Sequence, residues 1–211
     1  MDQLADRFVI LLGILNDIFY NPDYIPVFNY GALGAVVGHE VIHGYDTIGI
    51  DFDGNGKIHP WMSNKSRESF DEMAKCIIDE YGNFTLTDSN GTVWHVNGTN
   101  TSGEDVADNG GIRAAYNAFK SDPVNEQPFP RTKKLKDFTQ DQLFFMAYSR
   151  VWCSPPLADK DFERSFEDEH PPEQLRLFGA LRNFVPFREA FNCPAGSKYA
   201  PEKYCKVYAP S

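Results

Sequence analysis

The segment Val37–Gly44, which reads Val-Gly-His-Glu-Val-Ile-His-Gly, constrains this chain more than any other stretch. In an α-helix, residues four apart share a face, so His39 and His43 can direct their rings at one metal ion. Glu40 follows about 100° around the helix, where its carboxylate can reach a water beside that ion without becoming a ligand. The motif therefore predicts a helix that supplies two metal ligands and a general base.

The residues around this motif favour a metal site over a chance match. So short a motif can also arise on the surface of an ordinary helix, where it would bind nothing. Here the flanking residues are apolar on nearly all sides, which predicts a buried helix. Two imidazoles and a carboxylate in a buried helix need partners, and a metal ion would satisfy them. The apolar flanking residues are Ala35, Val36, Val37, Val41 and Ile42.

Apolar periodicity elsewhere predicts a mainly α fold (α+β) with a few short strands. With 211 residues, 42% of them hydrophobic, the chain can form one domain with its own core. Ser63 and Thr139 are expected to cap two of the helices. Helices are predicted at 29–44, 65–81, 102–119, 139–152, 172–183 and 186–191, short exposed strands and turns at 83–100, and a buried strand at 8–15.

Charge and cysteine usage limit the partners and the compartment. The formal charge of −10 argues against a nucleic-acid partner. Four cysteines without CxxC spacing are better read as disulfide halves than as a thiolate zinc site. Five glycosylation sequons in fewer than forty residues favour an extracellular or cell-surface ectodomain, although the apolar run 8–15 is too short for a membrane span. The sequon asparagines are Asn64, Asn83, Asn90, Asn97 and Asn100.

Two histidines do not complete a tetrahedral catalytic site, which needs a third protein ligand and an open position. Glu104 is the best candidate, because it begins a separate predicted helix in the run Gly103–Gly111. Asp108 lies one turn later on the same face and could accept the second N–H of His39 or His43. The alternative is an acidic helix start stabilised only by the helix dipole, which is our interpretation of Asp105.

The HExxH segment, followed some sixty residues later by Glu104-x-x-x-Asp108 and then Asn109-Gly-Gly, resembles the neprilysin and endothelin-converting-enzyme family of zinc metallopeptidases. The likeness extends over almost the whole chain. It includes the segments Phe19–Pro22, Tyr81–Phe84, Val151–Cys153 and Asp168–His170. The resemblance implies that residues 1–211 are the C-terminal catalytic part of a longer ectopeptidase, membrane-anchored or secreted, with a thermolysin-like core and without its N-terminal lobe.

The same resemblance implies a role for each residue of the motif. His39, His43 and Glu104 would hold one Zn2+, Glu40 would be the general base and later the proton donor, and Asp108 would orient a ligand histidine. These roles agree with the chemistry of the side chains, because zinc acidifies a bound water and a nearby carboxylate can move its proton.

Further along the chain, His170 resembles the family histidine that stabilises the tetrahedral oxyanion, with Asp168 holding its ring. Arg176 resembles the arginine that bonds the backbone carbonyl of the substrate, a task that suits its fixed fork of donors. Judged from the residues alone, His170 and Arg176 would be a loop histidine and a helix arginine on the surface.

Specificity is also implied by the resemblance. Five apolar side chains would form the pocket for a large hydrophobic residue, so that small peptides are cleaved on the amino side of that residue. Without the resemblance they would be ordinary core residues. They are Ile14, Phe19, Val36, Val151 and Trp152.

The family pattern further implies a disulfide between Cys76 and Cys205, with Cys153 and Cys193 pairing to cysteines outside this chain. Two other functions stay open. A zinc-binding fragment without activity could act only as an interaction module. A zinc aminopeptidase would need an acidic anchor for the substrate amine, and no such motif precedes His39.

Overall fold

The computed structural model describes residues 9–126 and 133–209. Within these ranges most residues are helical, and the strands form one antiparallel hairpin in which Leu86 pairs with Trp94. The predicted mainly α fold with a few short strands is therefore confirmed. The elements are α1 (Pro26–Asn29), α2 (Ala35–Ile42), α3 (Asn64–Tyr81), β1 (Thr85–Thr87), β2 (Val93–His95), α4 (Ser102–Ser121), α5 (Gln140–Val151), α6 (Phe162–Glu167), α7 (Glu173–Arg182) and α8 (Val185–Ala190).

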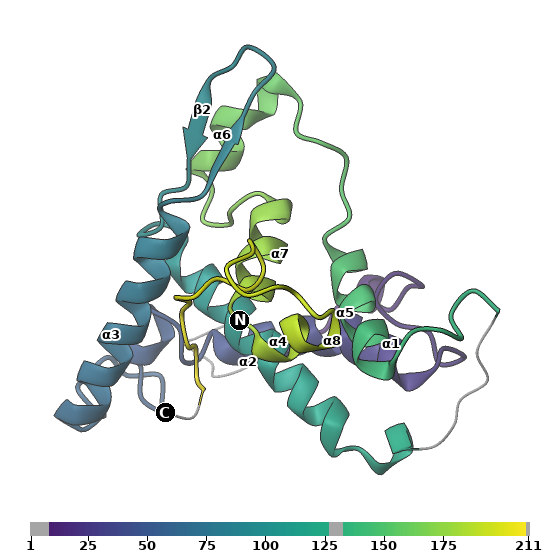
Figure 1. Cartoon of the computed structure of the whole chain (residues 1–211). Helices are drawn as coiled ribbons and strands as arrows, with labels where there is room; N and C mark the ends of the chain where they lie inside the picture. Colours follow the sequence, from purple (N-terminus) through teal and green to yellow (C-terminus); the bar gives the residue numbers. More distant parts are fainter. Residues whose placement is uncertain (1–8, 127–132, 210–211) are drawn as a thin grey trace.

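Figure 1 shows α4 crossing the middle of the molecule, with α3 on one side and α1, α5 and α8 on the other. The hairpin projects at one end beside α6, because Trp94 of β2 packs on the rings of Phe162 and Phe166. The loop after α6 then leads back to α7, next to α4. Segments distant in sequence are thereby gathered around α4.

Local capping signals set the starts of the longer helices. The Ser63 hydroxyl accepts a hydrogen bond from the Ser66 N–H at the start of α3. Thr139 and Gln142 form a reciprocal capping box at the start of α5. Both caps were predicted, and both are confirmed.

The helix that carries the HExxH motif is less regular than predicted. Instead of one α-helix over 29–44, α1 leads through a π-helical turn, Tyr30–Gly34, into α2, which ends at Ile42. Gly31 lies in this turn against α5, where an added Cβ would be 2.3 Å from the Phe144 carbonyl oxygen. The sequence periodicity does not reveal this change of pitch, because it is tied to close packing against α5.

Glycines allow α2 and α4 to touch backbone to backbone. A Cβ on Gly38 would lie 2.6 Å from the Gly111 carbonyl oxygen, and a Cβ on Gly111 would lie 2.5 Å from the His39 nitrogen. Both contacts are too short for any side chain, so only glycine permits this crossing. The crossing brings the first turn of α4 beside the histidines of α2.

Two aromatic-rich cores hold this arrangement. One joins α1, α4, α5 and α8 around Tyr116, Phe144 and Phe145, whose rings stack or meet edge to face. The other joins α3, the hairpin and α7 around Tyr81 and Phe84. Both cores include residues of α2 and α4, so the apolar surface that they bury stabilises the crossing of these two helices.

Two expectations were wrong. The run 8–15 is not a buried strand: Val9, Leu11 and Leu12 are 68%, 71% and 84% exposed, and a 3-10 turn covers Leu12–Ile14. It pairs with no strand among the described residues, and Phe8 lies outside them. Nor is α2 buried on nearly all sides, because only Ala35 and Gly38 are buried in it and Val41 is 42% exposed.

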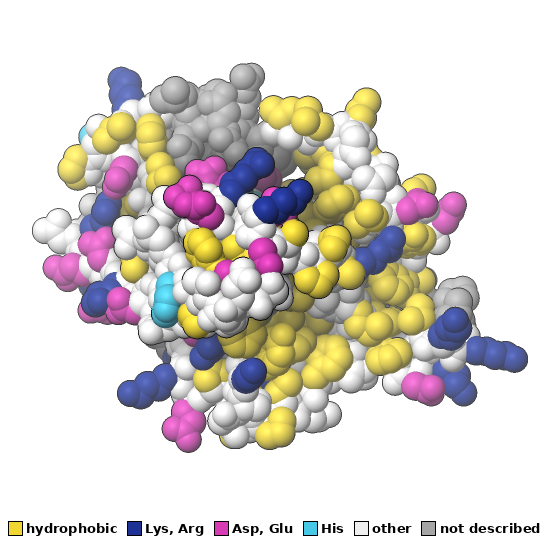
Figure 2. Space-filling model, turned by 90° about the horizontal axis from the view of Figure 1, so that it is seen from above, with side chains coloured by type: hydrophobic (Ala, Val, Ile, Leu, Met, Phe, Trp, Pro, Cys, Tyr) yellow, Lys and Arg dark blue, Asp and Glu magenta, His cyan; other side chains and the backbone are white. Residues whose placement is uncertain are grey.

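Hydrophobic side chains also reach the surface elsewhere. Figure 2 shows broad apolar areas between the charged side chains on one face. None of the helices in the described ranges combines the length and the apolar character that a membrane crossing requires.

Candidate metal centre and active site

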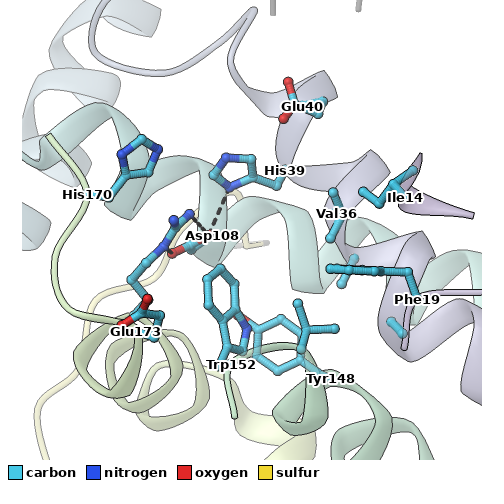
Figure 3. A pocket seen from close by; sticks show the side chains of 14 residues that line it. Ile14, Phe19, Val36, His39, Glu40, Asp108, Tyr148, Trp152, His170 and Glu173 are labelled. Carbon is cyan, nitrogen blue, oxygen red and sulfur yellow. Dashed lines mark hydrogen bonds and ion pairs between the residues drawn. The ribbon is translucent and has the colours of Figure 1, made fainter. Parts of the chain in front are cut away.

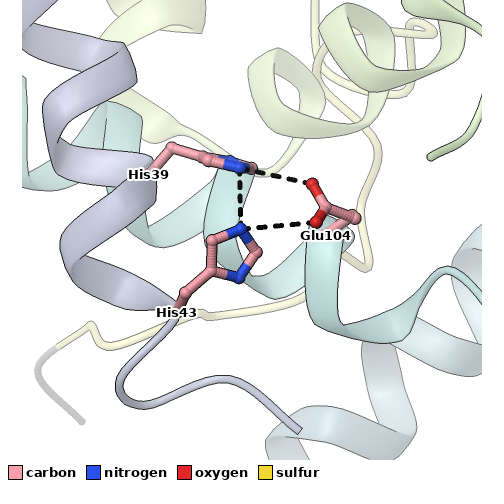
Figure 4. Close-up of side chains that lie close together, drawn as sticks. All are labelled: His39, His43 and Glu104. Atoms are coloured by element: carbon pink, nitrogen blue, oxygen red, sulfur yellow. Dashed lines mark hydrogen bonds and ion pairs between the residues drawn. The ribbon is translucent and has the colours of Figure 1, made fainter. Parts of the chain in front are cut away.

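Three potential metal ligands converge where α2 meets the first turn of α4 (Figure 4). The Nε2 atoms of His39 and His43 are 3.0 Å apart. Glu104 Oε2 lies 3.2 Å from His39 Nε2, and Glu104 Oε1 lies 3.3 Å from His43 Nε2. All three side chains are only 12–13% exposed. The three residues expected to share one metal are therefore brought together.

A carboxylate faces the second nitrogen of each imidazole. Asp108 Oδ1 lies 2.8 Å from His39 Nδ1, an ion-pair contact when the ring is protonated. Asp46 Oδ2 lies 2.5 Å from His43 Nδ1. Asp46 Oδ1 also accepts hydrogen bonds from the N–H groups of Ile48 and Gly49, which fixes its position. Asp108 thus faces His39, and Asp46 faces His43.

This donor set fits a tetrahedral zinc ion. Neighbouring ligand atoms around such an ion are about 3.3 Å apart when the bonds are about 2.0–2.1 Å long. The three observed separations of 3.0–3.3 Å are close to that value. With both Nδ1 atoms facing carboxylates, the Nε2 atoms of the two rings are turned to one position, where, once deprotonated, they would bind a cation together with Glu104. The residues present can therefore hold zinc.

The electrostatics also favour positive charge at this position. Burial alone would lower the pKa of His39, but the carboxylates of Asp108 and Glu104 outweigh it and raise that pKa to about 9. Burial alone would raise the pKa of Glu104, yet hydrogen bonds from His170 and His39 hold it well below its usual range. Glu104 is consequently ionised, as a metal ligand must be.

His170 approaches the same carboxylate from the loop between α6 and α7. Its Nε2 lies 3.2 Å from Glu104 Oε2, and its Nδ1 lies 2.8 Å from Asp168 Oδ1. The hydrogen bond with Glu104 raises the pKa of His170. The Asn100 side chain donates to the Asp168 carbonyl at 2.9 Å and so ties this loop to the segment before α4. His170 is thus a positioned residue of the site and not a free surface histidine.

Arg176 is buried and extends from α7 toward α4. It donates to Asp108 through Nε at 2.7 Å and Nη2 at 2.8 Å, and to Glu104 through Nη2 at 3.2 Å. Its guanidinium carbon lies 4.4 Å from the centre of a Trp152 ring. Among the described residues these bonds use Nε and Nη2, so the Nη1 donors are the part of the fork that is available to a substrate.

A cavity of about 400 Å3 opens beside these residues (Figure 3). Glu40 also lines it, one residue beyond His39 on α2. All six residues expected to contact substrate also line it, as do Ala32, Ala35, Tyr148 and Glu173. The six are Ile14, Phe19, Val36, Val151, Trp152 and Arg176.

The chain is similar to known proteins over most of its length. The model of the family described as Peptidase family M13 matches residues 4–207. The chain belongs to peptidase family M13. The expected resemblance to neprilysins and endothelin-converting enzymes is confirmed by the curated relatives of this M13 chain. The chain is 37% identical to Neprilysin-11 of Caenorhabditis elegans over 196 residues and 38% identical to the endothelin-converting enzyme homolog of Locusta migratoria over 205 residues.

Solved structures agree with this membership. The M13 chain superimposes with a TM-score of 0.83 and 30% identity on the Mycobacterium tuberculosis zinc metalloprotease ZMP1 in complex with an inhibitor, over 94% of this chain and 30% of that one. It superimposes with a TM-score of 0.80 and 30% identity on a Haemonchus galactose-containing glycoprotein complex, over 93% and 32%. The expected metallopeptidase fold is thereby confirmed.

The M13 chain is short beside these proteins. The alignments cover 93% and 96% of it, but only 23% of Neprilysin-11 and 27% of the locust protein. It therefore spans about a quarter of the curated relatives that it matches.

The M13 chain contains one disulfide among its described residues, and it joins Cys76 to Cys205 as expected. Cys153 and Cys193 are free thiols in the structure. The disulfide ties the C-terminal segment to α3. The Cys205 N–H donates to the side chain of buried Asn183, which in turn donates to Asn109 of α4. All five sequon asparagines are exposed, although Asn100 is also bonded to the His170 loop.

Asp46, Tyr148 and Glu173 are site residues that sequence reasoning missed. Asp46 follows His43 by three residues, which in a turn after a helix is close enough to reach the ring. Tyr148 precedes Trp152 by one helical turn, and Glu173 precedes Arg176 by three residues. Each could have been found by asking which polar or aromatic neighbours share the face of a residue already assigned to the site.

Proposed function

We propose that this chain is the catalytic part of a zinc metalloendopeptidase that hydrolyses small peptides on the amino side of bulky hydrophobic residues. The observation that carries the proposal is the convergence of His39, His43 and Glu104 at 3.0–3.3 Å, with a carboxylate behind each imidazole. Such a donor set leaves one tetrahedral position open, which distinguishes a catalytic from a structural zinc site.

Zinc, when bound, would acidify a water and polarise the scissile carbonyl. Glu40 would take the proton of the attacking water and deliver it to the leaving amine nitrogen. Its place on α2, one residue beyond His39 and lining the cavity, supports this role. Asp108 and Asp46 would hold the two ligand imidazoles in orientation.

His170 and Arg176 would act on the substrate. The Nε2–H of His170 would exchange its contact with Glu104 Oε2 for the oxyanion as that charge develops, with Asp168 fixing the ring through Nδ1. The Nη1 donors of Arg176 would bond a backbone carbonyl of the peptide, since Nε and Nη2 are engaged by Asp108 and Glu104. Burial of the guanidinium against Trp152 would keep the fork in one orientation.

The cavity supports the proposed preference for a large apolar residue. Ile14, Phe19 and Val36 line one side of it, and Val151 and Trp152 belong to or follow α5 on another. A volume of about 400 Å3 accommodates a phenylalanine or leucine side chain together with part of the peptide backbone.

Turnover of an internally quenched peptide containing one Phe tests the proposal. We expect zinc-dependent cleavage before the Phe, abolished by a chelator and lowered about 100- to 10,000-fold in Glu40→Gln at unchanged zinc content. Glu68→Gln, an exposed glutamate of α3, is the matched control and should behave as wild type. Stoichiometric zinc without cleavage of any peptide would contradict the proposal.

The second candidate function is a zinc-binding fragment without activity, which would bind zinc and cleave no peptide. An open apolar groove between α2 and α4 favours it, because such a surface suits contact with further polypeptide. The groove is lined by Tyr20, Tyr30, Leu33, Val37, Val41, Ala114 and Ala118, among others.

We also propose a secretory or cell-surface location with glycans on the sequon asparagines. The Cys76–Cys205 disulfide and the exposure of all five asparagines support it. Mass spectrometry of the protein from a secretory host, with and without glycosidase treatment, would test this location. Unmodified asparagines throughout would contradict it.

A further inference from the structure

The charged groups that line the cavity differ in whether the protein itself satisfies them. Arg176 is compensated by two bonds to Asp108 and one to Glu104. His170 lies between Glu104 and Asp168. Glu173 is different: within the part of the chain that the structure describes, its carboxylate takes part in no hydrogen bond and no ion pair. The cavity therefore presents one acidic group that its own residues leave uncompensated.

Glu173 is also well placed to act on a ligand. It is exposed and occupies the first turn of α7, a helix anchored by buried Leu175 and Arg176. The helix dipole stabilises a negative charge there. Figure 3 shows Glu173 beside the cavity below His170, on the side away from Ile14 and Phe19. The cavity thus has an apolar side and, across from it, an acidic side chain on a rigid element.

We propose that Glu173 is a specificity-determining residue that selects peptides carrying a lysine or arginine within two residues of the large apolar residue. The inference rests on the proposed peptidase function and adds to it the charge of the substrate. The apolar residue would occupy the side lined by Ile14, Phe19 and Val36, and the cationic group would lie against the Glu173 carboxylate.

The charge of the whole chain acts in the same direction. A formal charge of −10 attracts cationic peptides at long range and disfavours acidic ones. Arg176, which also lines the cavity, is compensated by Asp108 and Glu104, so its positive charge does not cancel the attraction. Because Glu173 is exposed, the effect on any one peptide is modest and depends on salt.

Matched peptides test this selectivity. One series carries a single Phe and places Lys, Gln or Glu at each of the two positions on either side of it. We expect kcat/KM for the Lys peptide to exceed that for the Gln peptide about five-fold at one or more of these positions. Glu173→Gln should abolish the preference, Glu173→Lys should reverse it toward the Glu peptide, and 0.5 M salt should weaken it in wild type.

Glu169→Gln is the control, because Glu169 is an exposed carboxylate four residues away that does not line the cavity. It should keep the preference. Equal preferences in wild type and Glu173→Gln would overturn the proposal, as would equal losses in the two glutamine variants.

A binding measurement separates this proposal from the proposed function. Anisotropy of labelled Lys and Gln peptides on the zinc-loaded Glu40→Gln variant, with and without Glu173→Gln, reads the same selectivity without turnover. Selective binding that depends on Glu173, without cleavage by wild type, would contradict the proposed peptidase function but support the proposed selectivity. Cleavage by wild type, with no selectivity in either measurement, would support the peptidase function and overturn the selectivity proposed for Glu173.

Discussion

The two histidines of the motif are anchored in opposite ways. At the C-terminal end of α2, His43 contacts Asp46, three residues later, and Asp46 is itself held by the backbone N–H groups of the turn that follows. His39, one turn earlier, contacts Asp108 of α4, which is held in turn by Arg176 of α7. One anchor is local, and the other depends on three helices meeting.

The difference indicates how such a site can fail. The local anchor forms with its own turn and needs little else. The distant anchor requires the glycine-mediated crossing of α2 and α4 and a buried ion pair, and a buried charge that loses its partner is strongly destabilising. We therefore expect damage at the His39 end to unfold the site and damage at the His43 end to weaken it.

The largest expected effect is that of Asp108→Ala, compared with Asp46→Ala. The first leaves the Arg176 guanidinium buried without its main partner and should lower the free energy of unfolding by about 3–5 kcal/mol. The second removes the acceptor of two backbone N–H groups and should cost about 1–3 kcal/mol. Urea denaturation of chelator-treated protein measures both.

The double variant Asp108→Ala/Arg176→Met serves as the control for this comparison. It should recover part of the stability that Asp108→Ala loses, because the unpaired charge is gone. Zinc affinity, measured against a chromophoric chelator, should fall about 10- to 100-fold in Asp108→Ala and in Asp46→Ala. Equal losses of stability at Asp108 and Asp46 would erase the distinction between the two anchors.

The crossing itself is tested by Gly111→Ala. The added Cβ would lie 2.5 Å from the His39 nitrogen, so α2 and α4 must separate. We expect a loss of about 3 kcal/mol in unfolding free energy together with weakened zinc binding. Gly34→Ala is the matched control, since its Cβ would meet no atom closer than 3.5 Å. A Gly111→Ala protein that binds zinc like wild type would show that the close approach is dispensable.

The smallest expected effect is a pH dependence of the metal-free protein. The pKa of His39 in the folded protein, about 9, lies above the value of about 6.5 in an unfolded chain. Its contribution to stability is therefore complete below pH 6.5 and is lost as the pH rises through 9. We expect the free energy of unfolding to fall by about 2 kcal/mol over this interval. Denaturation of chelator-treated protein at several pH values measures it, and His39→Gln should flatten the profile.

Local signals in the sequence predicted a large part of the fold. Thr139 and Gln142 marked the start of α5, and Ser63 marked the start of α3, because caps act over three residues. The spacing of His39 and His43 predicted a shared ligand face. The apolar run 8–15 misled, because composition cannot tell a buried strand from an exposed segment whose Ile14 lines a cavity. The π-turn at Tyr30–Gly34 was missed for a similar reason, since packing against α5 accompanies it.

By itself the sequence determined the ligand types and their helical spacing, and its likeness to a family indicated Glu104, His170 and Arg176 as candidate site residues. Only the tertiary structure decided which carboxylate faces which imidazole, that the Arg176 fork is shared with Asp108 and Glu104, and that Glu173 lines the cavity. The physical reason is range. Helical periodicity and capping act within a few residues, whereas the contacts of Asp108 with His39 and with Arg176 join segments tens of residues apart, and α2 meets α4 only because glycines let the two helices touch.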